Sequence, residues 1–144
     1  MIQPEDLPEV LAISTNAPIE PDDYFNFDIA HQQTITTLNG ETVGGVRVYL
    51  FHNVEDRDQM YNFLSLVETP EGIIPFQTPL IGDSISARQG STQSGETLIT
   101  LTFKRCYAVA HIWLRTDDDF NQQGNEIVVY SENLDERLQL VACP

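Results

Sequence analysis

The sequence predicts an α+β fold, an antiparallel sheet of about five strands with two helices packed on one face. Short runs in which apolar and polar residues alternate, as they do in strands, lie between Gln33 and Leu114. Two other segments repeat apolar residues at helical spacing, one in the middle of the chain and one at its end. The 144 residues, 41% of them hydrophobic, suit one α+β domain over residues 1–144 that buries its core without a metal ion.

The first two strands are expected near residues 33–38 and 42–51, on either side of Asn39 and Gly40. Asn-Gly is the pair that two-residue type I′ turns prefer, because both central residues of that turn need a positive φ. Alternation along the run VRVYLF in the second strand points three apolar side chains to the core, namely Val46, Val48 and Leu50.

Two amphipathic helices are expected. In NVEDRDQMYNFLSLVE, Asn53 is placed to cap the helix, and Glu55 and Asp56 favour a first turn. The apolar stripe of this helix consists of Met60, Phe63, Leu64 and Val67. A second helix, expected over residues 126–141, has a longer stripe made of Ile127, Tyr130, Leu134, Leu138 and Val141.

Three prolines between Thr69 and Leu80 predict a loop, after which DSISA, ETLITLTF and CYAVAHIWLR supply three more strands. A two-residue turn at Lys104 and Arg105 would pair Phe103 with Cys106. On that register one face of the hairpin is apolar, and its alanines leave room for a helix to approach. That face comprises Ile99, Leu101, Phe103, Cys106, Ala108, Ala110, Ile112 and Leu114.

Cys106 and Cys143 are predicted to form a disulfide. The strand that starts at Cys106 extends about 33 Å to Arg115 at roughly 3.3 Å per residue, and the final helix returns about 24 Å at roughly 1.5 Å per residue. A helix antiparallel to this strand on the core face therefore brings Cys143 back toward Cys106. The bridge would stabilise the fold by roughly 3–4 kcal/mol and would indicate an oxidising compartment. Two free thiols in a cytosolic protein are the alternative.

The chain is strongly acidic, with 22 acidic and 7 basic residues and a net charge of −15. Such a surface repels phosphate groups, and the basic residues form no stripe, so nucleic-acid binding is not expected. No run approaches the roughly 18 apolar residues of a membrane-spanning helix. The opening MIQPEDLPEV lacks the features of a signal peptide. Met1 is therefore either a genuine start or stands where a signal sequence or lipid anchor was removed.

Catalytic patterns are few. Cys106 and His111 point to opposite faces of one strand, which excludes a catalytic pair between them. Gly82-Asp83-Ser84 resembles the serine block of the GDSL hydrolases, but the D-x-x-H of Asp28 and His31 precedes it, whereas in that family the acid and histidine follow. Ser84 and Cys106 are kept as nucleophiles of an alternative hydrolase or thiol enzyme.

The acidic loop has part of the ligand pattern of a metal site. Asp117, Asp119 and Asn121 have the spacing of EF-hand ligands, but Gln122 and Val128 stand where that loop needs glycine and glutamate. A looser calcium site over Asp117–Asn121 stays open beside a solvated acidic loop. Cysteine and histidine show no zinc-ligand spacing, so neither a metal nor a cofactor is expected.

The sheet face opposite Cys106 has the composition of a recognition patch, with Arg47, Tyr49, Tyr107, His111 and Trp113. Aromatic rings and arginine supply contact area with little entropy to lose. The favoured alternative is that the N-terminal segment, residues 1–30, packs on the sheet there. This segment must bury apolar side chains, among them Leu7, Val10, Leu11, Tyr24, Phe25 and Phe27.

From IGDSISA through LTFKRCYAVAHIWL to the last helix, the chain resembles small α+β domains of bacterial secreted proteins and envelope lipoproteins, with a plan similar to PsbP-like proteins. The similarity covers Val43 to Val141, although those hairpins often turn at glycine and this one has Cys106. It implies a secreted, periplasmic or cell-surface location. We therefore expect a non-catalytic extracytoplasmic domain that binds a partner protein or small ligand. A structural subunit of a surface assembly is a further alternative.

Overall fold

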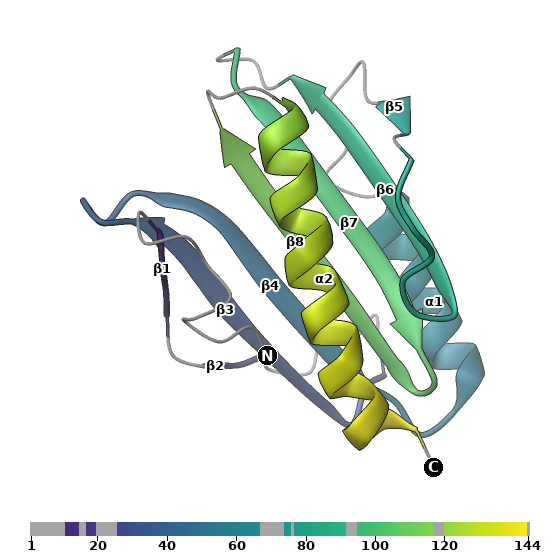
Figure 1. Cartoon of the computed structure of the whole chain (residues 1–144). Helices are drawn as coiled ribbons and strands as arrows, with labels where there is room; N and C mark the ends of the chain where they lie inside the picture. Colours follow the sequence, from purple (N-terminus) through teal and green to yellow (C-terminus); the bar gives the residue numbers. More distant parts are fainter. Residues whose placement is uncertain are drawn as a thin grey trace.

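The computed structural model describes residues 11–14, 17–19, 26–66, 74–75, 77–91, 95–116 and 120–143. Its five long strands form an antiparallel sheet in the order β3-β4-β8-β7-β6 (Figure 1). These strands are β3 (Ile29–Thr37), β4 (Thr42–Leu50), β6 (Ser84–Ser91), β7 (Thr97–Arg105) and β8 (Ala108–Thr116). Short β1 (Leu11–Ile13) and β2 (Ala17–Pro18) pair with β3, and β5 (Ile74–Pro75) pairs with β6.

The predicted α+β class, with about five strands in an antiparallel sheet and two helices, is confirmed. The helices are α1 (Val54–Leu66) and α2 (Phe120–Ala142). Their placement on one face is wrong, because they cover opposite faces of β7 and β8 (Figure 1). None of the described helices is long and apolar enough to cross a membrane.

The face under α2 carries the larger core. Phe103 pairs with Ala110 and Ile99 with Leu114, and the apolar face predicted for this hairpin is buried throughout β7 and β8. The strand side chains in this core include Val46, Val48, Ala87, Ile99, Leu101, Phe103, Ala108, Ala110, Ile112 and Leu114. From α2 the core receives Ile127, Tyr130, Leu134, Leu138 and Ala142. Val141, predicted for this stripe, is 68% exposed, because Ala142 takes the inward position one turn after Leu138.

The face under α1 carries a smaller core at one end of the sheet. It contains Ala30, Tyr49, Phe51, Met60, Leu64 and Val109. Ile19 and Phe27 pack against it, and the Phe27 and Tyr49 rings meet edge to face at 5.4 Å. Part of the N-terminal segment therefore packs on this face, while β1 and β2 extend the sheet edge. Leu7, Val10, Tyr24 and Phe25 lie outside the described residues.

The start of α1 is as predicted, since the Asn53 carboxamide oxygen accepts the Asp56 N–H at 2.8 Å. Met60 and Leu64 face the sheet, whereas Phe63 is 41% exposed. Val67 lies outside the described residues.

Both hairpin turns differ from the expected ones. The β3–β4 connection is a three-residue loop in which the Gly40 N–H donates to the Thr37 carbonyl at 2.9 Å. Only Gly40 takes a positive φ, of 87°, so the loop is a type I turn followed by a left-handed glycine rather than a type I′ turn. The β7–β8 turn lies at Cys106 and Tyr107, not at Lys104 and Arg105.

The shift of the second turn leaves the faces of the hairpin unchanged. Arg105 now pairs with Ala108, and Phe103 pairs with Ala110 instead of Cys106. The partner of each β7 residue has moved by four positions, and side chains alternate with a period of two. The predicted core face was therefore right even though the predicted turn was wrong.

Candidate functional site

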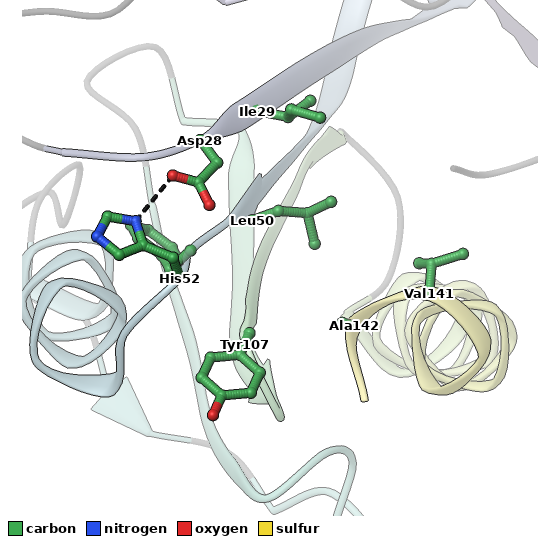
Figure 2. A pocket seen from close by; sticks show the side chains of 8 residues that line it. Asp28, Ile29, Leu50, His52, Tyr107, Val141 and Ala142 are labelled. Atoms are coloured by element: carbon green, nitrogen blue, oxygen red, sulfur yellow. Dashed lines mark hydrogen bonds and ion pairs between the residues drawn. The ribbon is translucent and has the colours of Figure 1, made fainter. Parts of the chain in front are cut away.

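A pocket of about 320 Å³ opens where β3 begins, β4 ends, α2 ends and the β7–β8 hairpin turns (Figure 2). This volume lies in the range of small-molecule sites, roughly 300–1,000 Å³. The lining residues are Asp28, Ile29, Leu50, Phe51, His52, Tyr107, Val141 and Ala142. Strand pairing and the end of α2 thus bring together four segments that are distant in the sequence.

The wall of the pocket is apolar and accessible. Ile29 and Leu50 are cross-strand partners at the end of the β3–β4 hairpin. Ile29 is 52% exposed, Tyr107 37% and Val141 68%. Single exposed apolar side chains need no explanation, but a group of them around a concavity is typical of a binding site.

The polar part of the pocket is a hydrogen-bonded Asp28–His52 pair, with 2.8 Å between Asp28 Oδ1 and His52 Nδ1. The Asp28 N–H donates to the Leu50 carbonyl at 2.8 Å, which fixes the backbone at this carboxylate. Asn53 Nδ2 lies 3.3 Å from His52 Nε2. In Figure 2 the second oxygen of Asp28 turns away from His52 toward Leu50.

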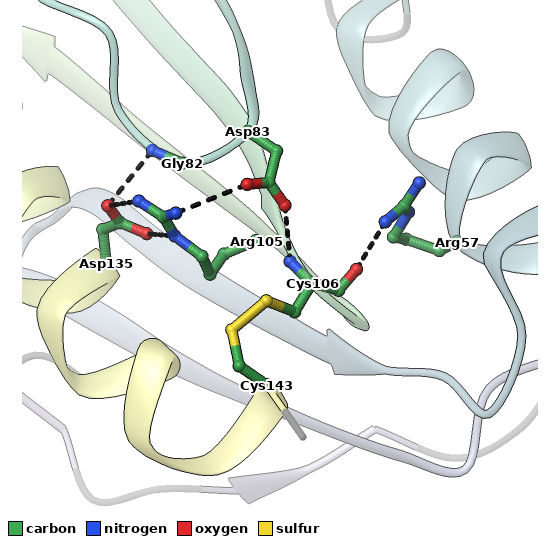
Figure 3. Close-up of polar contacts among 7 residues, drawn as sticks. All are labelled: Arg57, Gly82, Asp83, Arg105, Cys106, Asp135 and Cys143. Atoms are coloured by element: carbon green, nitrogen blue, oxygen red, sulfur yellow. Dashed lines mark hydrogen bonds and ion pairs between the residues drawn. A yellow bond between two sulfur atoms is a disulfide. The ribbon is translucent and has the colours of Figure 1, made fainter.

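Tyr107 of the β7–β8 turn lines the pocket, and four contacts hold this turn. Figure 3 shows the three that involve Cys106. Cys106 adopts a left-handed φ of 51°, a conformation that favours glycine. Its N–H donates to Asp83 Oδ2 at 2.7 Å, and its carbonyl accepts a hydrogen bond from the Arg57 guanidinium. Its side chain forms the predicted disulfide with Cys143, with Cα atoms 5.1 Å apart. The next residue, Tyr107, donates its N–H to the Ala142 carbonyl at 3.2 Å.

A partly buried ion pair supports this turn from the side of α2. Asp135, one of the buried residues of α2, accepts two hydrogen bonds of 2.7 Å from Arg105 and one of 3.1 Å from the Gly82 N–H. The hydrogen bonds that Arg105 donates to the Asp135 carboxylate raise the pKa of Arg105 above its usual value. Gly82 has a φ of 69°, and a Cβ there would lie 2.4 Å from the Lys104 carbonyl oxygen. The Gly-Asp motif thus has a structural role in shaping the turn.

The structure does not arrange the candidate nucleophiles Ser84 and Cys106 for nucleophilic catalysis. Cys106 is disulfide-bonded, so it offers no thiolate. Ser84 begins β6 opposite Lys104. Asp28 pairs with His52 rather than with His31 of the D-x-x-H. The Tyr107 hydroxyl points away from the Asp28–His52 pair (Figure 2).

The five residues predicted as a recognition patch do not share one exposed surface. Tyr49 and His111 are 6% and 1% exposed. Tyr49 packs in the core under α1, and His111 Nδ1 lies 2.8 Å from Thr102 Oγ1. Tyr107 is exposed, but it lines the pocket at the turn.

Arg47 and Trp113 are half-buried and line a separate slot of about 90 Å³. Trp113 lies across from Gly45, where a Cβ would be 2.7 Å from the indole Nε1. Glycine at position 45 therefore leaves the space that the Trp113 indole occupies. A binding role for Arg47 and Trp113 stays a prediction.

Asp117 and Asp119 of the candidate calcium site lie outside the described residues. Within the ranges that the structure describes, no group of three or more His, Cys, Asp or Glu side chains is arranged to hold a metal ion.

Sequence reasoning missed the pocket, although one signal pointed to it. Once Ile29 is paired with Leu50, the residues just beyond the hairpin end, Asp28 and His52, must come close. Comparison of the chain with models of known families, with curated proteins and with solved structures found no match.

Proposed function

We propose that this protein is a non-catalytic extracytoplasmic domain that binds a small amphipathic ligand in the pocket between β3, β4 and α2. The observation that carries the proposal is the convergence of apolar side chains from four segments around the Asp28–His52 pair (Figure 2). Apolar walls supply affinity by removing ligand surface from water, and a few polar groups fix orientation.

A binding role explains the pocket better than catalysis does. Nucleophilic catalysis needs a hydroxyl or thiol within hydrogen-bond reach of its base, roughly 2.6–3.2 Å. The Tyr107 hydroxyl points away from His52, and the sulfur of Cys106 is bonded to Cys143. The Asp28–His52 pair therefore serves as a recognition group.

The location outside the cytoplasm is supported by the disulfide. Cys106 and Cys143 are the chain's two cysteines, and their bridge joins the turn to the end of α2. Structural disulfides of this kind persist in oxidising compartments. The resemblance to small envelope α+β domains favours the same location.

The proposal is tested by a ligand-observed NMR screen of a fragment library, followed by titration of the hits into matched variants. Val141→Ser removes an apolar wall of the pocket, whereas Leu140→Ser alters an adjacent side chain that is 84% exposed and does not line it. Both positions are on the surface, so both variants are expected to fold. Hits should bind about fivefold to tenfold more weakly to Val141→Ser, in line with the loss of one buried aliphatic side chain, and unchanged to Leu140→Ser. Equal binding to all three proteins, or a screen without hits, contradicts the proposal.

A further inference from the structure

We infer that the pocket selects a monocation, an alkylammonium or related amine that carries a short apolar group. This inference rests on the proposed function, because it names the ligand class of the same pocket. The observation behind it is a carboxylate with one oxygen committed to His52 and the other directed to the apolar wall (Figure 2).

The geometry of Asp28 is suited to receive an ammonium group. Its Oδ1 is held by His52 Nδ1 at 2.8 Å, and its own N–H is held by the Leu50 carbonyl at 2.8 Å. Its Oδ2 accepts no hydrogen bond from the described residues. A carboxylate prepared in this way offers a charge-assisted hydrogen bond, which is about twice as strong as one between neutral groups.

The charges around the pocket favour a cation over an anion. The lining residues include one carboxylate and no lysine or arginine. The basic side chains beside the β7–β8 turn are already paired. Arg57 and Lys104 both contact Asp58 Oδ1 at 2.8 Å, while Arg105 is held between Asp83 and Asp135. With a net charge of −15, the protein attracts small cations and repels anionic ligands.

The apolar group of the ligand has a defined place. Ile29 and Leu50 lie beside Asp28 on paired strand ends, and Val141 lies across from them at the end of α2 (Figure 2). An ammonium at Asp28 therefore directs its alkyl chain between the strands and the helix. Neither part of such a ligand needs to displace a side chain of the core.

The inference is tested with three probes of the same chain length: hexylammonium, 1-hexanol and hexanoate. Binding is followed through the methyl resonances of Ile29, Leu50 and Val141. Hexylammonium is expected to bind about tenfold more tightly than 1-hexanol, as expected for a charge-assisted hydrogen bond, and hexanoate is expected to bind most weakly. Asp28→Asn should reduce hexylammonium binding to the level of 1-hexanol. The Asp28 side chain is 49% exposed, so this variant should fold.

Glu41→Gln is the matched control, because it removes one exposed carboxylate at the opposite end of β4. It should leave hexylammonium binding unchanged, whereas a loss equal to that of Asp28→Asn would mean that net charge alone attracts the probe and would overturn the inference. Equal binding of hexylammonium and 1-hexanol also overturns it while leaving the proposed pocket intact. If no probe shifts the three methyl resonances, the proposed function fails together with the inference.

Discussion

On the α2 face of the sheet, apolar side chains are buried along the whole length of β7 and β8, and both Ile99 near one end and Ala108 at the other are fully buried. On the α1 face the apolar cluster occupies one end only. Farther along that face the buried side chains are polar, with Thr100, Thr102 and His111 at 7%, 2% and 1% exposed. The same strand alternation thus produces an apolar layer under α2 and a mixed layer on the other side.

The two helices also differ in how they are attached. α2 is joined to the sheet by a disulfide and by the partly buried Asp135–Arg105 pair. α1 contacts the β7–β8 turn through Arg57, and its Asp58, which is 43% exposed, forms an ion pair with Lys104 of β7. Solvent-exposed ion pairs contribute little, whereas a large apolar layer contributes much. We therefore expect the α2 face to dominate stability.

The largest effect is expected from truncating a leucine on each helix. Leu134→Ala on α2 should lower the free energy of unfolding by about 3–5 kcal/mol, and Leu64→Ala on α1 by about 2–3 kcal/mol, because the larger core relaxes less around a cavity. The two leucines are 0% and 6% exposed, which makes them a matched pair. Urea denaturation followed by circular dichroism measures both. If Leu64→Ala lowered the free energy of unfolding as much as Leu134→Ala or more, the α2 face would not dominate stability.

The disulfide comes next. Cys143→Ser should cost about 3–4 kcal/mol, because opening a bridge that spans 37 residues restores conformational entropy to the unfolded chain. Reduction of the wild-type protein with a dithiol should give the same change, while the reductant should leave the variant unaffected. A loss below about 1 kcal/mol would mean that hydrogen bonds and packing alone hold the end of α2.

A smaller effect is expected on the mixed part of the α1 face. Gly45→Ala should cost about 1–3 kcal/mol, because the new methyl group would lie 2.7 Å from Trp113 Nε1 and would force the indole to move. Trp113 is the chain's only tryptophan, so its fluorescence emission reports the movement directly. In a Trp113→Leu background the same glycine substitution should cost much less. Equal costs in both backgrounds would show that the indole does not depend on Gly45.

The smallest effect concerns the Lys104–Asp58 pair. The Lys104 ammonium, followed by Arg57, lowers the pKa of Asp58 below its usual 3.8. The pKa of Asp58 is lower in the folded protein than in the unfolded chain. Ionised Asp58 therefore stabilises the fold at pH values above its unfolded pKa. This contribution is lost as the pH falls through the pKa of the folded state. Asp58→Asn should cost about 0.5 kcal/mol near neutral pH, an exposed-pair value.

The difference in stability between wild type and Asp58→Asn should shrink toward zero as the pH falls through the lowered pKa of folded Asp58. Unfolding in urea at several pH values measures it. Glu132→Gln, which removes an exposed carboxylate of α2, is measured in the same way as the control. A difference that persists at the lowest pH would assign the effect to packing rather than to charge.

Much of the fold is determined by local patterns in the sequence. Alternation identified the apolar face from Ile99 to Leu114, helical spacing identified Ile127, Tyr130, Leu134 and Leu138, and Asn53 marked the start of α1. The disulfide followed from two lengths, a strand that extends and a helix that returns. These features depend on residues near one another in the chain or on simple geometry, so the sequence alone was sufficient.

Four other features were decided only by the tertiary structure. Alternation does not say on which face the helix between two strands crosses, so α1 was placed on the wrong side. A turn shifted by two residues preserves both faces, so the pattern could not locate the turn at Cys106. The conformation of Cys106 is set by contacts from Asp83, Arg57 and Cys143, which are 23, 49 and 37 residues away. The pocket likewise forms only when four distant segments meet, because no local pattern encodes a surface shared between them.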